Sequence, residues 1–487
     1  MAVVCSFLIS AQEVAGYQIT DVSYQIDGIT REYPLRQAVP VDTNTIFQDM
    51  ADLTEYIGDL IKRLENQRVL ESVEIVTDFG VPGPDFLVPV LLTIKTVDTW
   101  NIIGLPYPKY DSNDGFQFKL KLKDYNFLGS MHVMNADVIY ELDTQGESQF
   151  ATNFDFSIPF SVAGYDMNLK NDFNMTIPVG EVPEYTFKMG TDISIPFSIA
   201  SLVIGLDESL HINDRNSTEM YSDDPVYFAT TFQGYMPFVV YTFDFFGDLI
   251  WSPYASVTMN LDPDGIDHPD LRGPAYSWGH SVSVGRVDWY GNFRRGFSFD
   301  VGNSWSWNGY TRDPVGTTID TTIKAYYSAY DFFGVSSRIK GFYNFREAVS
   351  EDRGSVLRGI LDDRIETDTA VSFNIDFPVK IMHVNFPEIT GVKWTRFVSF
   401  DMHASPFLDI SLVHDQKTGR YFNPKDGWYA AGLEVIVFPM KMRSIYGRIS
   451  LGFDIAELIS NDFNFSARAV RDGDDIKELF IGIGLEY

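Results

Sequence analysis

Residues 115–124 read GFQFKLKLKD, and this stretch decides the fold. Apolar and polar residues alternate strictly along it. Successive side chains of a β-strand point to opposite faces, so one face of this strand meets apolar material and the other meets water. The two faces consist of Phe116, Phe118, Leu120 and Leu122 on the apolar side and Gln117, Lys119, Lys121 and Lys123 on the polar side.

The same two-residue period continues to the end of the chain. In residues 370–380, Val371 and Phe373 alternate with Ser372 and Asn374. From residue 114 onward such segments, of roughly 10–15 residues, are separated by turn residues and acidic loops, as in transmembrane β-barrels. They number about 16 or 17, and single-chain bacterial barrels favour an even count. We therefore expect a mainly β chain whose residues 114–487 form an antiparallel transmembrane β-barrel of about 16 strands.

A soluble β-sandwich or β-propeller also has alternating strands and is the alternative for this pattern. Large apolar residues line one face throughout, however, and no blade-length repeat recurs. The chain contains 39 Phe, 26 Tyr and 8 Trp. No stretch of about 18 uncharged apolar residues occurs, which excludes transmembrane helices. Trp251, Trp394 and Trp428 are expected in an aromatic girdle at the lipid interface.

The charge of the chain limits its partners. The formal net charge of the 487 residues is −30. Binding of nucleic-acid phosphates needs clustered Lys and Arg, so nucleic acid is excluded as a partner. Many acidic residues lie in turn-like segments such as 261–270, which completes no EF-hand pattern and is interpreted as a solvated loop. The seven histidines and one cysteine form no zinc-binding cluster, so we expect no metal and no cofactor.

The start of the chain predicts an export signal and a small domain. Residues 1–12 resemble the end of such a signal, and Cys5, the only cysteine, can form no internal disulfide. Lipid modification of Cys5 is the alternative role for this residue. Residues 17–98 predict one compact α+β domain in which a helix begins near Ile46, with Thr45 and Gln48 as a capping box.

Three stretches resemble the superfamily that includes BamA, TamA, the mitochondrial sorting-and-assembly barrels and the two-partner-secretion transporters. DVSYQIDGIT, residues 21–30, and LIKRLENQRVLESVEIV, residues 60–76, are similar to a POTRA repeat. PYPKYDSNDGFQFKLKLKDYNFLGS, residues 106–130, resembles the start of the barrel in that family. SVLRGILDD, residues 355–363, followed by AVSFNIDFP, residues 370–378, resembles the sixth extracellular loop and the strand after it.

The resemblance implies a role for the tip of that loop, which would fold back into the lumen. The tip residues would be Leu357, Arg358, Gly359 and Ile360, with Ile360 in place of the usual aromatic residue. The family pattern also implies that Arg358 contacts inward acids on the following strands, here Asp376 and Asp401. A guanidinium can bind carboxylates bidentately, which would hold a long loop in a wet lumen. A solvent-exposed Arg358 is the alternative.

The last ten residues, ELFIGIGLEY, predict a closing strand that ends on an aromatic residue. This ending resembles the C-terminal insertion signal of bacterial outer-membrane barrels. A barrel closes by pairing its first and last strands, and a weak junction leaves an edge that can template another strand. We expect this lateral seam between residues 115–124 and 478–487. Besides Phe116, Phe118, Leu120 and Leu122, it would contain Leu479, Ile481, Gly482, Ile483, Gly484, Leu485 and Tyr487, in which the two glycines weaken the strand.

By resemblance, the function is insertion or translocation of polypeptides at the bacterial outer membrane, with the POTRA-like domain in the periplasm. The implied partners are the outer-membrane lipid bilayer, unfolded or nascent outer-membrane or secreted polypeptides, and periplasmic or lipoprotein partners of the POTRA-like domain. A passive porin and a dedicated two-partner-type secretion transporter are the alternatives. An enzyme is not expected, because HExxH and GxSxG motifs are absent. His403, Asp401 and Ser405 share one inward face, where polar residues that line a wet lumen need no catalytic role.

Overall fold

The computed structural model describes residues 15–487 except for 112–114, 143–145, 181, 198–199, 214–223, 244–245, 346–355, 362–363, 443–445 and 484–487. The expected export-signal remnant and Cys5 lie outside the described residues. The chain divides into two compact units. The first comprises Met1–Trp100 with Leu128–Met131, and the second comprises Asn101–Phe127 with His132–Tyr487.

The first unit is a four-stranded sheet with two helices, as an α+β domain requires. Its strands are β1 (Gly16–Asp27), β2 (Ile46–Phe47), β3 (Leu70–Phe79) and β4 (Leu87–Asp98), and its helices are α1 (Glu32–Ala38) and α2 (Met50–Glu65). The strand order is β2-β1-β4-β3, with β1 and β4 parallel and β3 antiparallel to β4. Strand β3 therefore forms one edge of the described sheet.

The start of α2 differs from the expectation. Ile46 and Phe47 pair with β1 as the short strand β2, and the helix begins only at Met50. The Asp49 carboxylate accepts hydrogen bonds from the backbone N–H groups of Ala51 at 2.8 Å and Asp52 at 2.9 Å. The prediction of a capping box at Thr45 and Gln48 was wrong, because Asp49 is the N-cap residue and satisfies the free N–H groups of the first turn.

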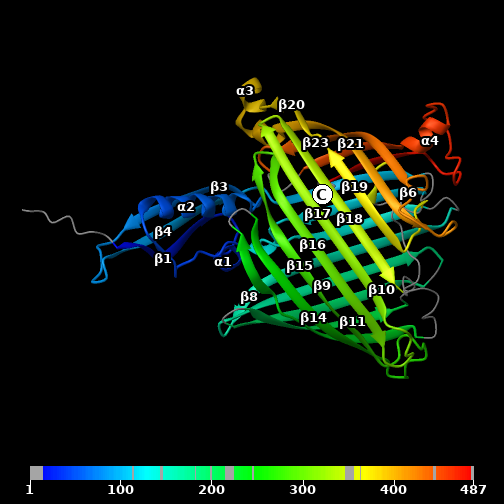
Figure 1. Ribbon diagram of the computed structural model, residues 1–487, viewed down its shortest axis with the longest axis horizontal. Coiled ribbons are helices and arrows are strands. Elements are labelled where there is room, and N and C mark those ends of the chain that lie inside the picture. The colour runs from blue at the N-terminus through cyan, green and yellow to red at the C-terminus, as the bar shows by residue number, and fades with distance from the viewer. Residues whose placement is uncertain are drawn as a thin grey trace, which may run out of the picture. The chain divides into compact units, whose positions relative to one another are not determined.

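The second unit is a closed barrel, in which each strand is hydrogen-bonded to its neighbours in the sheet (Figure 1). Its strands are β5 (Ile102–Asp111), β6 (Gly115–Asp124), β7 (Met134–Leu142), β8 (Ser148–Val162), β9 (Tyr165–Pro178), β10 (Glu184–Pro196), β11 (Ser201–Ile212), β12 (Val226–Tyr235), β13 (Phe238–Phe243), β14 (Gly247–Leu261), β15 (Pro274–Tyr290), β16 (Phe293–Asn308), β17 (Gly316–Tyr330), β18 (Phe333–Phe345), β19 (Thr369–Asp376), β20 (Val379–Val384), β21 (Phe400–Asp415), β22 (Arg420–Tyr421), β23 (Trp428–Pro439), β24 (Gly447–Asp454) and β25 (Lys477–Ile483). Short helices α3 (Phe386–Thr390) and α4 (Ile455–Ser460) lie between strands.

The strand count of 16 and the barrel start at residue 114 were wrong. Strands β12 and β13 share the neighbour β14, β19 and β20 share β21, and β22 is a two-residue side hairpin. The described part of the chain contains 21 barrel strands, β5 to β25. With β12 and β13 counted as one interrupted strand, β19 and β20 as another, and β22 left out, they correspond to 18 strands around the barrel. The sequence pattern missed β5, because Pro106 and Pro108 interrupt its alternation.

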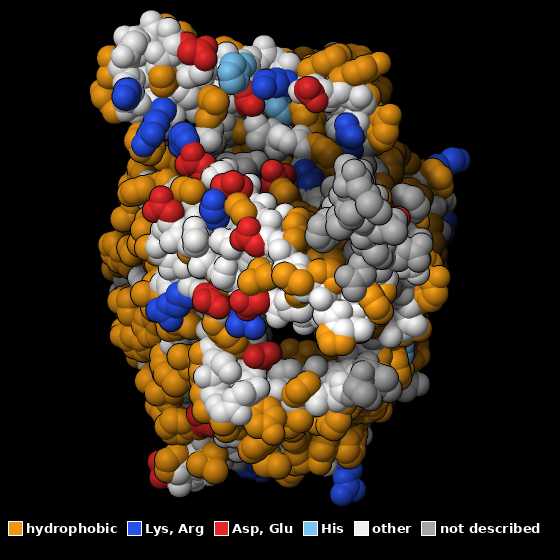
Figure 2. Space-filling view, turned by 90° about the vertical axis from the view of Figure 1, so that its left-hand side faces the viewer, with side chains coloured by type: hydrophobic (Ala, Val, Ile, Leu, Met, Phe, Trp, Pro, Cys, Tyr) orange, Lys and Arg blue, Asp and Glu red, His pale blue; other side chains and the backbone are white. Residues whose placement is uncertain are grey.

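The two faces of the barrel strands follow the alternation expected from the sequence. Phe116, Phe118, Leu120 and Leu122 are exposed on the outside of β6. Figure 2 shows hydrophobic side chains along both flanks of the molecule. Among the described residues, no helix is long and apolar enough to cross a membrane.

The expected aromatic girdle is only partly present. Trp251 on β14 and Trp394 between β20 and β21 are exposed, but Trp428 at the start of β23 is buried and points inward. Its ring is covered by the guanidinium groups of Arg471 at 3.8 Å and Arg364 at 5.2 Å. Trp428 shares the inward parity of Ala430, and both belong to the apolar cluster inside the barrel.

The hairpins at the two ends of the barrel differ in length. Connections at one end are mostly short, such as Ala163–Gly164 and Gly291–Asn292. Connections at the other end are mostly long, such as residues 346–368 and 455–476. This asymmetry is typical of outer-membrane barrels, which have short periplasmic turns and long extracellular loops. Residues 385–399, which contain α3, are an exception at the short-turn end, and Figure 1 shows α3 and α4 at opposite ends of the barrel.

Candidate functional site

The loop between β18 and β19 places a short segment inside the barrel. Residues 356–361 are buried, although they belong to no strand. Leu357 and Ile360 pack in an apolar cluster with Ile365 from the same loop. The barrel wall contributes Phe342, Ala370, Val413, Trp428 and Ala430 to this cluster. This part of the lumen is thus filled like the core of a soluble protein.

Arg358 is fixed by carboxylates on two strands. Its Nε and Nη2 donate to the two oxygens of Asp409 on β21 at 3.0 and 2.8 Å, and its Nη1 donates to Asp376 on β19 at 2.7 Å. Its backbone N–H also donates to Asp409 at 2.9 Å. The guanidinium stacks on the Phe407 ring at 3.8 Å. Asp409 is fully buried, so these charge-assisted hydrogen bonds lie away from bulk water.

A second arginine extends this cluster to two further strands. Glu434 on β23 lies 3.8 Å from Nη1 of Arg358 and 3.1 Å from Nη1 of Arg448 on β24. Arg448 in turn stacks on the ring of Phe480 on β25 at 4.1 Å. Three buried carboxylates and two buried arginines therefore join β19, β21, β23 and β24. Removing one member of such a network leaves an unpaired buried charge.

Two glycines let the loop backbone touch the barrel wall. Gly359 has a φ of +96°, and a Cβ atom there would lie 2.3 Å from the backbone N of Phe453. A Cβ atom on Gly452 of β24 would lie 2.7 Å from the carbonyl carbon of Arg358. Gly359 also donates its backbone N–H to Glu478 on β25 at 2.8 Å. The loop tip is thereby attached to the closing strand of the barrel.

Arg364 forms a further anchor where the loop returns towards β19. Its side chain is fully buried and donates to Asp472 at 2.9 Å and to Asp454 at 3.1 Å. Asp454 ends β24, and Asp472 belongs to the loop between β24 and β25. The Asp454 carboxylate also accepts from the backbone N–H of Glu457 in α4. The β18–β19 loop is thus held to the loop that precedes the closing strand.

The structure brings Arg358 and Asp376 together but places Asp401 elsewhere. Asp401 is bound by Lys380 at 2.9 Å, His383 at 2.6 Å and Asn292 at 2.9 Å, near the short-turn end of β21. Asp409 takes the expected place of Asp401. The two acids are eight residues apart on one face, which corresponds to roughly 26 Å along a strand. Alternation identifies the face of a strand but not the level along it.

Several residues of the site were missed by sequence reasoning. These residues are Asp409, Glu434, Arg448, Gly452 and Glu478. Glu434 carried a detectable signal, because it is the one acid among the inward residues of an otherwise apolar strand β23. The roles of the other residues depend on which strands lie next to each other in the barrel. The alternation of apolar and polar residues contains no such information.

The expected seam between residues 115–124 and the last strand was wrong. Strand β6 pairs with β5 on one side and with β7 on the other. The neighbours that close the barrel are β5 and β25. Leu479 and Ile481 point outward on β25, which also contains Gly482 and Ile483. Gly484, Leu485 and Tyr487 lie outside the described residues.

In β5, the backbone nitrogen atoms of two prolines point towards β25. The backbone N–H of Tyr125 donates to the Asn101 carbonyl at 3.0 Å, which fixes the phase of the β5–β6 ladder. Backbone N–H and C=O groups alternate in direction along an antiparallel strand. Those of residues 101, 103 and 105 therefore point to β6, whereas the backbone of Pro106 and Pro108 is directed to β25. Proline has no N–H, and β5 therefore offers no donor to β25 at these two positions.

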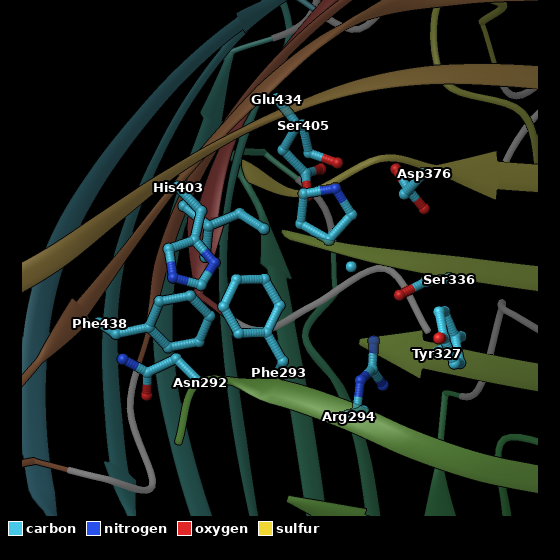
Figure 3. A pocket seen from close by; sticks show the side chains of 13 residues that line it. Asn292, Phe293, Arg294, Tyr327, Ser336, Asp376, His403, Ser405, Glu434 and Phe438 are labelled. Carbon is cyan, nitrogen blue, oxygen red and sulfur yellow. The ribbon is translucent and has the colours of Figure 1, made fainter. Parts of the chain in front are cut away.

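A small cavity adjoins the arginine cluster (Figure 3). Arg294, Asp376 and Glu434 help to line it. The His403 ring stacks on Phe293, with ring centroids 4.6 Å apart, and lies tilted against Phe438 at 4.8 Å. The cavity volume is about 40 Å³, which is enough for a few water molecules and too small for a cofactor. Within the described ranges, no three His, Cys, Asp or Glu residues are grouped to hold a metal ion.

Comparisons with known proteins give structural neighbours but no sequence relatives. No family model matches the chain, and no curated protein matches it. CdiB from Acinetobacter baumannii is similar at 11% identity over 90% of this chain and 70% of that chain, with a TM-score of 0.47. CdiB from Escherichia coli has 9% identity over 98% and 92% of the two chains and a TM-score of 0.42. BamA from Haemophilus ducreyi, lacking POTRA domains 1–3, has 13% identity over 97% and 86%, and a TM-score of 0.40.

Proposed function

We propose that this chain is an outer-membrane barrel that inserts or translocates other polypeptides through a lateral opening between β5 and β25. The observation that carries the proposal is the missing pair of donors at Pro106 and Pro108 on the side of β5 that faces β25. A strand pair with fewer hydrogen bonds opens at lower cost than a pair with a complete ladder. No covalent step is involved.

The loop-tip cluster supports this proposal, because it separates the moving part of the barrel from the fixed part. Arg358 holds β19 and β21, and Gly359 holds β25 through Glu478. When the junction opens, β25 remains attached to the loop while β5 is free to move away. A client strand would then add to the exposed edge by backbone hydrogen bonds.

The first unit offers a second edge for the same type of recognition. Strand β3 has β4 on one side and no partner strand on the other among the described residues. An extended segment of an unfolded client, or of a periplasmic or lipoprotein partner, would pair with β3 by strand addition. We place this unit in the periplasm, since the chain enters the barrel at the end that has the short turns.

A disulfide across the junction tests the proposal. In a Cys5→Ser background, single cysteines in residues 102–106 would be combined with Cys at Leu479 or Ile481, and the oxidised pairs selected. We expect the locked barrel to fold but to lose complementation of a depleted strain, and reductant to restore it. The matched control joins Ile449 and Ile481, which already face each other on β24 and β25. Full activity of the β5–β25 lock would overturn the lateral opening.

A passive channel is the second candidate, favoured by the lining of the other half of the lumen. On the inward faces of β9–β11, Lys170 lies 3.0 Å from Asp192 and 3.1 Å from Asp207. Steady ion conduction by the β5–β25-locked protein in planar bilayers, without any loss of outer-membrane proteins on depletion, would favour this candidate.

The class of client can be identified by depleting this protein from cells and measuring the levels of outer-membrane and secreted proteins. A broad loss of outer-membrane barrels is the result expected for an insertase. Loss of one secreted protein alone would instead identify a dedicated two-partner-type transporter. Each outcome is distinct from the unchanged protein levels that a channel predicts.

A further inference from the structure

The segment between β20 and β21 is unusual for the end of the barrel at which it lies. The two preceding hairpins at this end connect their strands through two residues each, Gly291–Asn292 and Asp331–Phe332, and the following one spans residues 440–446, whereas this connection spans residues 385–399. It folds into α3 and a 3-10 helix, Lys393–Val398. We refer to residues 385–399 as the rim segment.

The rim segment is held in shape by its own hydrogen bonds. The backbone N–H of Phe386 donates to the Ser399 hydroxyl at 3.1 Å, and the Gly391 N–H donates to the Pro387 carbonyl at 2.9 Å. The hydroxyl groups of Thr390 and Thr395 lie 3.1 Å apart. The direction of its outward side chains is therefore set by a defined backbone.

Those outward side chains are large and apolar. Ile389 is 70% exposed and Trp394 is 67% exposed. The other exposed apolar residues of the rim segment are Val392, Phe397 and Val398. The neighbouring residues Ile381 and Met382 on β20 are exposed as well, so the apolar surface continues from the wall of the barrel into the rim segment. A patch of this kind marks a contact with a membrane or another protein.

The charge of the rim segment differs from that of the rest of the chain. It contains two cations, Lys393 and Arg396, and one acid, Glu388, in a chain with a net charge of −30. The Glu388 carboxylate is bound by the side-chain amide of Asn385 at 2.7 Å. Tryptophan prefers the boundary between headgroups and acyl chains, and nearby Lys and Arg reach anionic headgroups.

We propose that the rim segment lies in the lipid interface at the short-turn end of the barrel and binds anionic phospholipid headgroups through Lys393 and Arg396. Ile389 and Trp394 enter the boundary of the acyl chains beside the barrel wall. The continuity of the apolar surface with β20 selects lipid as the occupant, because the lipid that covers Ile381 and Met382 also reaches these two side chains. This contact rests on the transmembrane placement that the proposed function also requires.

The test uses the full chain with Cys5→Ser and one new cysteine, labelled with an environment-sensitive dye, in vesicles of phosphatidylethanolamine and phosphatidylglycerol. Vesicles with spin-labelled acyl chains quench a dye that touches lipid. We expect several-fold stronger quenching for Ile389→Cys and Trp394→Cys than for Asp300→Cys, an exposed position on the inward face of β16. Leu433→Cys, on the outward face of β23, is the positive control.

The controls separate the possible failures. Quenching at Leu433 without quenching at Ile389 and Trp394 would overturn the interfacial contact and leave the proposed function intact. The same result is expected if a protein surface, rather than lipid, covers the rim segment. Absence of quenching at Leu433 would overturn the membrane placement itself. In the double variant Lys393→Gln/Arg396→Gln, we expect weaker quenching at Trp394→Cys with phosphatidylglycerol and no change with phosphatidylcholine alone. An equal effect in both lipids would contradict recognition of anionic headgroups.

Discussion

The two halves of the barrel wall stabilise the same sheet in different ways. In the half that contains β19–β25, the loop tip fills the lumen, and Arg358 binds buried carboxylates inside an apolar cluster. In the half that contains β9–β12, the inward side chains form ion pairs such as Lys170–Asp192, with the Lys170 side chain about one third exposed. A buried network fixes strands relative to one another, whereas pairs in a wet lumen contribute little to rigidity. The difference places the fixed part of the barrel next to β25.

We expect the largest loss of stability for Arg358→Met, which removes the central cation of the buried network. The substitution leaves Asp376 and Asp409 buried without their shared cation, which costs about 3–5 kcal/mol of unfolding free energy. Urea unfolding of the purified protein in lipid vesicles, followed by tryptophan fluorescence, measures this loss. The double variant Arg358→Met/Asp409→Leu should recover part of it, since it removes an unpaired carboxylate. A loss below about 1 kcal/mol would mean that the cluster is open to water.

Substitution of Gly359 by Ala tests the close contact between the loop and β24. The positive φ and the backbone of Phe453 oppose a Cβ atom, so we expect a loss of about 1–3 kcal/mol in the same assay. Gly302→Ala on β16 is the matched control, because a Cβ atom there would meet no atom within 4 Å. Equal stability of the two variants would show that the tip does not need to approach Gly452.

The sequence revealed the faces of the strands far better than their neighbours. Alternation placed Phe118 outside and Asp376 inside, because the side-chain period depends only on local backbone geometry. It failed for β5, where Pro106 and Pro108 break the pattern although the strand pairs fully with β6. It also failed for Asp409, whose role depends on how far the loop enters the lumen. Position along a strand comes from the register of the whole sheet, which no single segment contains.

Glu478→Gln is expected to have a smaller effect, confined to the closing strand. The amide still accepts the Gly359 N–H, but a charged acceptor is replaced by a neutral one, at a cost of about 1 kcal/mol. We expect faster amide hydrogen exchange in β25 with little change in global unfolding. Glu141→Gln on β7, whose carboxylate accepts from Gln117 and Gln149, is the control in the other half. If both variants leave exchange in β25 unchanged, the loop tip does not restrain this strand.

The smallest expected change in stability is that of Lys170→Met, which sharpens the contrast from the other side of the barrel. After the substitution Lys188 remains 3.3 Å from the buried Asp207, and Gln233 still donates to Asp192 at 3.5 Å, so the loss should stay below about 1 kcal/mol. The lumen loses one positive charge beside Asp192 and Asp207, and the reversal potential in planar bilayers should shift towards cation preference. Lys188→Met, with a more exposed side chain, should shift it less. A loss of stability as large as that of Arg358→Met would contradict the division of the barrel into a fixed half and a solvated half.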